Sequence, residues 1–160
     1  MSTEQLDLVW REIDRIETCM MVTHDAGTIR ARPMVGRADR PAKTIWFISN
    51  RTRHKDDEVA ADPSVCLTYA DVARNTYLSI SGKAMLSDDR AKLRELWSTG
   101  VDAWFKDGPD DPDAILIAVR PESAEYWDNP NSDLLVAVRT LTASGTDQPA
   151  QVGENRKIEM

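Results

Sequence analysis

The feature that most constrains the fold is a succession of short apolar runs separated by turn residues. Six or seven such runs occur, at residues 19–24, 28–37, 43–49, 64–71, 75–86, 114–120 and 122–128. Alternation of apolar and polar residues over short runs is typical of half-buried strands. Short helical segments interrupt the runs, whereas long helices do not alternate with them. The pattern therefore predicts an antiparallel barrel with peripheral α-helices and argues against a doubly wound parallel sheet.

Three segments between these runs are predicted to be helical. In residues 2–17, apolar side chains recur at helical spacing, and Ser2 with Gln5 has the spacing of a capping box. Residues 53–62 form a second helix that ends before Pro63. Residues 87–97 form a third, for which Ser87 is the expected N-cap.

The end of the chain is expected to contribute less to the core. Residues 132–141 have a helical pattern, and residues 142–157 are polar and are expected to be loosely held. The length fits one domain covering residues 1–160, with about the last 15 residues loosely ordered.

The composition is that of a globular protein, with 41% hydrophobic and 29% charged residues. No apolar run approaches the ~18 residues needed to cross a bilayer, so we expect no membrane association. The first 17 residues mix acidic and apolar side chains and have no basic leader or apolar signal core. These features predict a cytoplasmic protein.

Cysteine and histidine are too sparse to suggest a metal site. Cys19 and Cys66 both lie in apolar strand-like runs and are interpreted as reduced core thiols. The two histidines, His24 and His54, lack the spacing of a zinc motif. A nucleophilic pair of Cys66 with His24 is conceivable, but nothing in the sequence brings the two together.

The charge distribution is more informative than the total. A formal net charge of −7 argues against a nucleic-acid binder, because that affinity comes mainly from Lys and Arg. Between residues 28 and 55, however, eight cationic residues stand against one acidic residue. Such a local field can bind one small anion.

We call the segment 49–55 and the strand-like segment 28–37 the basic corner. Ser49, Asn50 and Thr52 supply neutral donors just before the expected start of a helix, and Arg53 and Lys55 add charge. Arg30 and Arg32 are two residues apart on a strand, so they project from the same face. This donor set suits a phosphate monoester better than a carboxylate. On the residues alone, a phosphate site and a solvated charged turn both remain open.

The order of several motifs resembles one known family. "RARPM" (30–34) is followed by "IWFISN" (45–50), "RHK" (53–55), "YLSISGKA" (77–84) and "ESAEYW" (122–127). This order, over nearly the entire chain, is similar to the pyridoxamine 5′-phosphate oxidase-like superfamily of FMN-binding split barrels, and most to its bacterial general-stress-protein branch. The resemblance implies a mainly β fold, a six- to seven-stranded antiparallel Greek-key split β-barrel with peripheral helices.

The resemblance also implies a cofactor and the residues that hold it. The cofactor is FMN, with FAD as the alternative, bound between the subunits of a homodimer. Tyr77 and Leu78 match the place where the partner subunit approaches the flavin, and Trp127 matches an aromatic residue near its ring. His54 stands where the family's oxidases usually have arginine. The implied cofactor-binding residues are Arg32, Met34, Val35, Ile48, Ser49, Arg53, His54, Lys55, Tyr77 and Trp127.

One departure from the family limits the function. Pyridoxamine phosphate oxidases end with an Arg-x-His motif, whereas residues 128–140 after Trp127 read "DNPNSDLLVAVRT". We therefore expect a stress-related FMN oxidoreductase acting on an unidentified small molecule, and not a vitamin B6 oxidase. No residue is identified as a catalytic acid or base, which leaves turnover open. The alternatives are a non-catalytic flavin storage or sensor module, and a barrel that binds haem or another anion.

Overall fold

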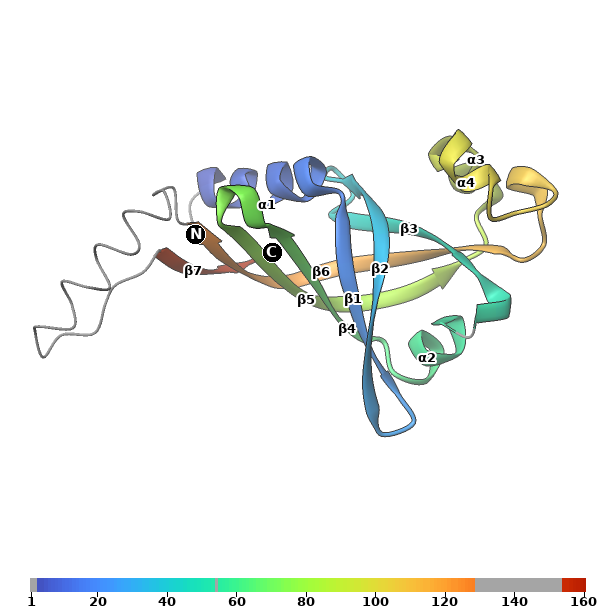
Figure 1. Ribbon diagram of the computed structural model, residues 1–160, viewed down its shortest axis with the longest axis horizontal. Helices are drawn as coiled ribbons and strands as arrows, with labels where there is room; N and C mark the ends of the chain where they lie inside the picture. Colours follow the sequence, from blue (N-terminus) through green and yellow to red (C-terminus); the bar gives the residue numbers. More distant parts are fainter. Residues whose placement is uncertain (1–2, 54, 129–153) are drawn as a thin grey trace, which may run out of the picture.

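The computed structural model describes residues 3–53, 55–128 and 154–160 of the chain (Figure 1). The α-helices are α1 (Thr3–Ile16), α2 (Lys55–Ala61), α3 (Arg90–Leu96) and α4 (Thr99–Asp102). Single 3₁₀ turns lie at Arg51–Arg53, Val72–Arg74 and Gly108–Asp110. The strands are β1 (Thr18–Asp25), β2 (Thr28–Asp39), β3 (Thr44–Asn50), β4 (Ser64–Asp71), β5 (Thr76–Ser87), β6 (Ala114–Asp128) and β7 (Glu154–Glu159).

The strands form one antiparallel sheet that closes on itself. Its order is β3-β2-β1-β4-β5-β6-β7, and an additional pairing of β3 with β6 closes the first six of these strands into a barrel. The pairing of β2 with β3 runs only from Asp39↔Thr44 to Gly36↔Phe47. Beyond that pair the two strands separate. The predicted six- to seven-stranded antiparallel split barrel is confirmed.

The hairpin of β1 and β2 forms as its sequence predicts. The strands pair from Thr18↔Val35 to Asp25↔Thr28, which leaves Ala26 and Gly27 as a two-residue turn. Both turn residues have positive φ, 46° and 87°, as tight hairpin turns require. Glycine at the second position adopts this conformation without steric cost.

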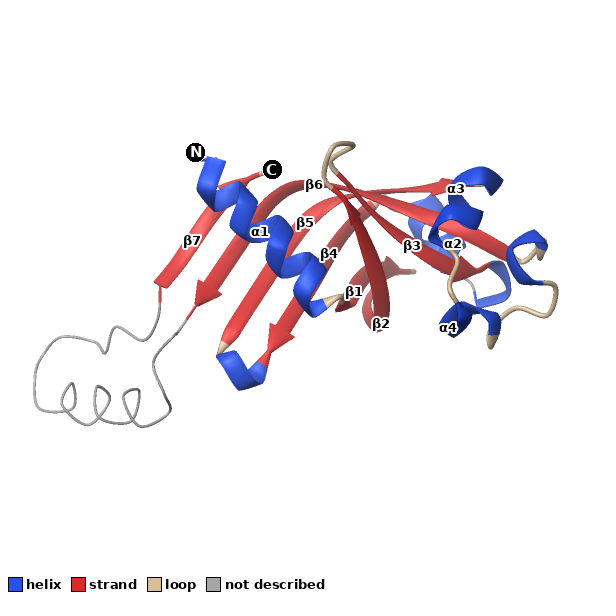
Figure 2. Cartoon of the chain, turned by 90° about the horizontal axis from the view of Figure 1, so that it is seen from above, coloured by secondary structure: helices blue, strands red, loops and turns tan. Residues whose placement is uncertain are grey.

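Alternation along the strands fills the barrel. The inward residues of β1, β4 and β5 are almost fully buried, and α1 adds Val9, Trp10 and Ile13 to the same cluster. Figure 2 shows α1 lying across strands of the β4–β5 side. The predicted first helix is therefore confirmed, while its capping residue Ser2 lies outside the described residues.

A second, smaller cluster forms on the other side of β3. Leu93 of α3 and Phe105 pack against Ala114 and Leu116 of β6, and Ile48 of β3 packs against them. This cluster separates α3 and α4 from the barrel interior, and Figure 1 shows both helices at one end of the molecule.

Two predicted strands are one strand in the structure. Residues 114–120 and 122–128 both belong to the 15-residue β6. Pro121 lies between the two predicted strands, but it pairs with Gly82 at a register shift between Ser81 and Gly82. A bulge tolerates a residue that cannot donate to the ladder, so the strand continues through the proline.

Two expectations near helix and chain ends are wrong. Asp89 caps α3, since its side chain accepts from the Lys92 amide, and Ser87 instead accepts from the Asp89 amide. At the end of the chain, part of the segment expected to be loosely held forms β7, which pairs with β6 and buries Ile158. The helix predicted at residues 132–141 lies outside the described residues.

No helix in the part of the chain that the structure describes is long and apolar enough to cross a membrane.

Candidate functional site

The basic corner lies where β2 and β3 separate. On β2, Arg32 lies on the same face as the buried Met34 and Gly36, and on β3, Ser49 lies on the same face as the buried Phe47. Extending the register by two residues from Gly36↔Phe47 puts Ser49 level with Met34, although no ladder bond joins the strands there. Helix α2 packs against β1, β3 and β5 at this end of the barrel.

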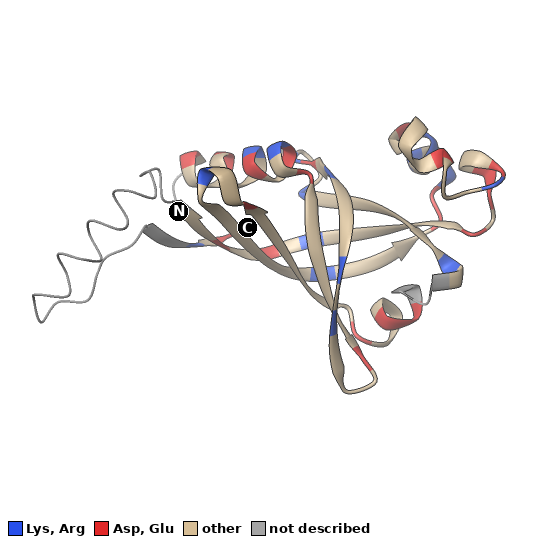
Figure 3. Ribbon diagram, viewed as in Figure 1, with Lys and Arg blue, Asp and Glu red and all other residues tan. Residues whose placement is uncertain are grey.

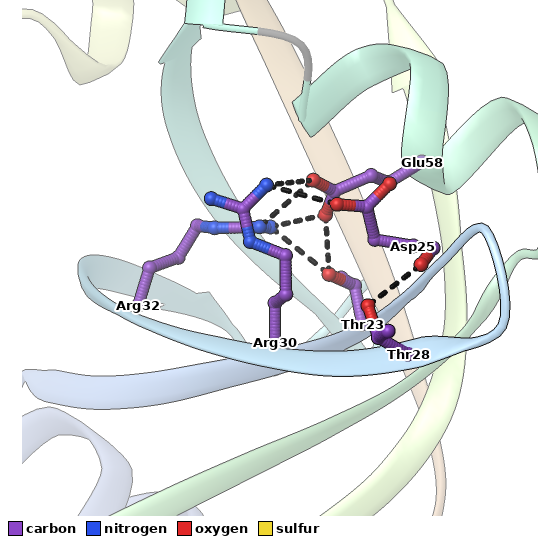
Figure 4. A network of polar contacts seen from close by, with 6 residues as sticks. All are labelled: Thr23, Asp25, Thr28, Arg30, Arg32 and Glu58. Atoms are coloured by element: carbon purple, nitrogen blue, oxygen red, sulfur yellow. Dashed lines mark hydrogen bonds and ion pairs between the residues drawn. The ribbon is translucent and has the colours of Figure 1, made fainter.

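A buried carboxylate of α2 holds Arg32 in place (Figure 4). Glu58 accepts two hydrogen bonds from the Arg32 guanidinium, from Nη1 to Oε2 at 2.5 Å and from Nη2 to Oε1 at 2.9 Å. Thr23 of β1 joins both partners, because its hydroxyl donates to Glu58 Oε2 at 2.5 Å and accepts from Arg32 Nη1 at 2.9 Å. The side chains of Arg32 and Glu58 are 13% and 5% exposed. This ion pair is therefore largely shielded from water.

Arg30 lies at the edge of the same network. Its Nη1 donates to Asp25 Oδ2 at 2.9 Å and is 3.5 Å from Glu58 Oε1. Its side chain is more than half exposed, so the pair with Asp25 contributes little to stability. As the spacing predicts, Arg30 and Arg32 project from one face of β2 toward the same carboxylate.

The network keeps Glu58 ionised. Burial alone raises the pKa of the Glu58 carboxyl, but the hydrogen bonds from Arg32 and Thr23 and the charge of Arg32 outweigh burial. The pKa of Glu58 is consequently below its ordinary value. At neutral pH, Arg32 faces a full negative charge on α2.

Arg32 is engaged along one edge only. A guanidinium has five N–H donors in a planar fork. Glu58 and Thr23 accept three hydrogen bonds from Arg32, two from Nη1 and one from Nη2. Among the described residues, the Nε–H and the second Nη2–H have no recorded acceptor. These two donors point to the same side, and such a pair matches two oxygens of a phosphate or carboxylate.

Ser49 presents a polar atom that lacks a partner. Its residue is buried, 3% exposed, and within the described part of the chain its Oγ makes no hydrogen bond. Native proteins pair nearly all buried polar side-chain atoms, so an unpaired hydroxyl in a core position calls for an explanation. A bound oxyanion supplies one, since the hydroxyl can donate to it.

The turn that follows Ser49 leads into α2. The 3₁₀ turn Arg51–Arg53 and the start of α2 at Lys55 lie where the sequence predicts a helix start. His54 lies outside the described residues. For Arg53 and Lys55 the structure describes the backbone and not the side chains, so their predicted contacts with phosphate stay predictions.

Three other predicted ligands face different directions. The side chain of Met34 is buried in the barrel core, while Val35 is 54% exposed on the outer face of β2. Ile48 faces away from Ser49 and packs in the second cluster with Leu93. A ligand at the basic corner could therefore meet Ile48 only through its backbone, whereas Met34 shares the inward face of Arg32.

Tyr77 and Trp127 pair directly across β5 and β6. Tyr77 is exposed on the outer face of β5, and its neighbour Leu78 is buried in the core, so the Leu78 side chain is not available to a ligand. Strand β5 is three strands from β2 in the sheet, roughly 14 Å at the usual strand spacing. Trp127 is 12 residues along β6 from Ile115, the partner of Ser49, or roughly 40 Å. Within one chain, the aromatic pair does not reach the basic corner.

The outer face of β2, β1, β4 and β5 carries uncovered apolar side chains. We call it the outer sheet face; its exposed large apolar residues are Met20, Ile29, Val35, Tyr77 and Met85. Figure 3 shows the middle of β1 and β4 without charge. The described helices pack elsewhere, since α1 and α2 add Val9 and Val59 to the barrel core. An exposed apolar area of this kind is typical of an interaction surface.

The two cysteines differ in environment. Cys19 is buried, and burial raises the pKa of its thiol to about 12, which fits the predicted inert core thiol. Cys66 was also assigned to the core, but it is only half-buried on the outer sheet face, with Sγ 3.4 Å from Ser79 Oγ. Alternation explains the difference, because Val65 and Leu67 take the inward positions.

Among residues 3–53, 55–128 and 154–160, no three His, Cys, Asp or Glu side chains gather as a metal site requires.

Two residues of the site were missed from the sequence. Thr23 could have been found, because it continues the inward alternation of Cys19 and Met21. Glu58 gave no such signal. It lies in a seven-residue helix with two other acidic residues, and only the packing of α2 against the barrel selects it for burial.

Comparison with known proteins finds a matching family model and relatives of this chain. The family model described as pyridoxamine 5′-phosphate oxidase like matches residues 4–150. General stress protein 26 of Bacillus subtilis (strain 168) is 28% identical over 86 residues, which cover 49% of this chain and 58% of that protein. The match thus spans less than two thirds of this relative.

Solved structures show the same fold. A crystal structure of a general stress protein 26 from Jannaschia sp. CCS1 has a TM-score of 0.75 and 27% identity, and covers 99% of this chain and all of that one. A general stress FMN/FAD binding protein from Xanthomonas citri has a TM-score of 0.72 and 23% identity, and covers 82% of this chain and 93% of that one.

Proposed function

This chain belongs to the pyridoxamine 5′-phosphate oxidase-like family, in its general-stress-protein branch, and from that premise we propose that it binds FMN through the basic corner. The single observation that carries the proposal is the pair of unused donors on inward-facing side chains, the free edge of Arg32 and the hydroxyl of Ser49. Both suit the phosphate of a flavin mononucleotide. The name of the Xanthomonas citri relative, an FMN/FAD binding protein, supports the same class of ligand.

In this proposal, Arg32 and Ser49 hold the phosphate, together with Arg53 and Lys55 from the adjoining turn. FAD is the alternative cofactor. When bound, the flavin supplies a ring that accepts and returns electrons, while the protein supplies position and electrostatics. The basic corner fixes the phosphate end, and the remaining contacts of the ring come from elsewhere.

The chain is proposed to act as a homodimer with the flavin between subunits. The outer sheet face is apolar and uncovered by the described helices, which suits a second copy of the chain. Tyr77 and Trp127 do not reach the basic corner of their own chain, so the partner's Tyr77 and the partner's Trp127 are the ones proposed to cover the ring. Both arguments point to a site completed by dimerisation.

The proposed activity is electron transfer between the flavin and a small molecule in the cytoplasm during stress. A non-catalytic flavin store or sensor is the second candidate. One observation favours it: Arg30 and Arg32 of the basic corner are engaged in ion pairs with Glu58 of α2. A reductant and an acceptor that cycle the bound flavin at a useful rate would reject this second candidate.

The test of the proposal is an absorption spectrum of the purified protein, with mass spectrometry of what heat denaturation releases. Flavin absorption and released FMN are the expected result. A colourless protein that takes up no added FMN would overturn the proposal, and a Soret band in place of flavin absorption would support a haem-binding barrel.

A further inference from the structure

We propose that Glu58 is a positioning residue for the phosphate site, which holds one edge of the Arg32 guanidinium so that the other edge is presented to the phosphate. The inference rests on the proposed function, because it takes Arg32 as a phosphate ligand. It adds a residue on α2 that makes no contact with the ligand and acts on its binding through Arg32.

The geometry of the guanidinium carries the inference. Glu58 takes the end-on edge, with bonds from both Nη1 and Nη2, and Thr23 accepts a further bond from Nη1 beside it. These three bonds fix both the plane of the guanidinium and its rotation in that plane. The orientation of the side-on edge, which consists of Nε–H and the second Nη2–H, is then fixed. A fork held in this way loses little conformational freedom when it binds two oxygens of a phosphate.

Burial makes Glu58 a fixed partner and not a competitor that the phosphate displaces. Its carboxylate is 5% exposed and accepts from Arg32, Thr23 and, at 3.5 Å, Arg30. If a phosphate took over the end-on edge, this buried charge would lose its main partner, which is strongly unfavourable. Binding at the side-on edge costs no such loss. The phosphate is therefore expected to join the network and leave the bonds between Arg32 and Glu58 intact.

Lysine cannot replace arginine in this arrangement. An ammonium group provides three donors around one nitrogen, without a planar fork that can serve two partners along separate edges. If Glu58 works through Arg32, the effects of changing either residue must overlap. A double-mutant cycle measures this overlap directly.

The experiment measures FMN and riboflavin affinities of the full chain by flavin fluorescence, for the wild type, Glu58→Gln, Arg32→Lys and the double variant. The ratio of the two affinities isolates the phosphate contribution. We expect each single variant to lose about tenfold or more of the wild-type preference for FMN, with riboflavin affinity unchanged, and the double variant to lose no more than Arg32→Lys. A Glu58→Gln variant that keeps the full preference, or losses that multiply in the double variant, would overturn the inference while the proposed function stands.

Two further variants serve as a matched control and as a substitute for Glu58→Gln if that variant does not fold. Asp25→Asn is the matched control, because Asp25 pairs with the exposed Arg30 and makes no bond to Arg32, so it should keep the wild-type preference. If Glu58→Gln does not fold, Thr23→Val removes the other anchor of Nη1, and a smaller loss in the same direction is expected. Full preference in Thr23→Val would contradict the inference. A wild type that binds FMN and riboflavin equally would instead refute the proposed phosphate site, and the inference with it.

Discussion

At the scale of the residue, single polar atoms determine whether the basic corner can bind a phosphate. Arg32 and Ser49 were both predicted as ligands from the sequence, and strand alternation correctly predicts that Arg32 shares a face with Arg30. Sequence could not show that Ser49 Oγ lacks a partner or that Glu58 holds Arg32, because both depend on how α2 packs on the barrel. Periodicity predicts the direction in which a side chain points, but not the residues that it contacts.

Ser49→Ala tests the unpaired hydroxyl, with opposite effects on stability and binding. Removing a buried hydroxyl that has no partner should leave the free energy of unfolding of the ligand-free protein unchanged or raise it by up to about 1 kcal/mol. FMN affinity should fall while riboflavin affinity does not. Chemical denaturation and flavin titration measure the two effects.

Thr44→Val is the contrast on the same strand. Thr44 is also buried, but its hydroxyl donates to the Ala42 carbonyl at 3.0 Å, so its removal should cost about 1 kcal/mol of stability and leave FMN affinity unchanged. If Ser49→Ala destabilises the ligand-free protein as much as Thr44→Val does, Ser49 has an internal partner and our interpretation of its hydroxyl is wrong.

The Glu58 network predicts a dependence of stability on pH. The folded-state pKa of Glu58 lies below the ordinary value of 4.5, so its contribution is complete above about pH 4.5 and is lost as pH falls through the folded pKa. The charged neighbours that face it are Asp25, Arg30 and Arg32. Glu58→Gln should cost roughly 2 to 4 kcal/mol at pH 7, and the difference from wild type should shrink on acidification. Denaturant unfolding at pH 7 and at pH 3 measures this, and a constant difference would contradict it.

At the scale of the element, most strands and helices follow from pattern, and the exceptions have physical reasons. Two strands were predicted on either side of Pro121, but a bulge beside Gly82 lets β6 continue through this proline. β7 was missed because its one buried apolar residue, Ile158, lies among polar neighbours, and pairing with β6 supplies what local sequence lacks. Both exceptions arise from contacts between strands far apart in the chain.

Gly82→Ala tests the bulge. A Cβ at Gly82 would lie 2.4 Å from the backbone oxygen of Arg120, and backbone in a paired strand cannot move away cheaply. We expect a loss of about 1 to 3 kcal/mol in unfolding free energy. Gly100→Ala is the control: Gly100 lies in α4, its Cβ would make only an ordinary contact with Ser98, the residue before the helix, and the substitution should be neutral or slightly stabilising. Equal effects of the two substitutions in thermal or chemical unfolding would disprove the close approach.

At the scale of the whole molecule, the outer sheet face and the basic corner are proposed to belong to one site that two subunits form. The fold class was predictable because the succession of short strands leaves few architectures. The distance between the basic corner and the pair of Tyr77 and Trp127 was not predictable, because it depends on strand order and on the length of β6. That distance is what makes a second subunit necessary for the proposed site.

Val35→Glu tests the dimer. It puts a charge on the outer sheet face, where Val35 is 54% exposed and contributes nothing to the barrel core. The variant should fold, dissociate to monomers and bind FMN more weakly. Val72→Glu, at an even more exposed valine in the turn between β4 and β5, should remain dimeric. Light scattering over a range of concentrations separates the cases, and a Val35→Glu dimer as stable as that of the wild type would exclude this face.

The basic corner is proposed to bind a phosphate that belongs to a flavin. The most direct measurement is a titration of the wild-type protein with FMN and, separately, with riboflavin, which lacks only the phosphate. We expect an FMN affinity at least about tenfold higher, from charged hydrogen bonds of about 1.5 to 3 kcal/mol. Equal affinities for the two flavins would contradict it.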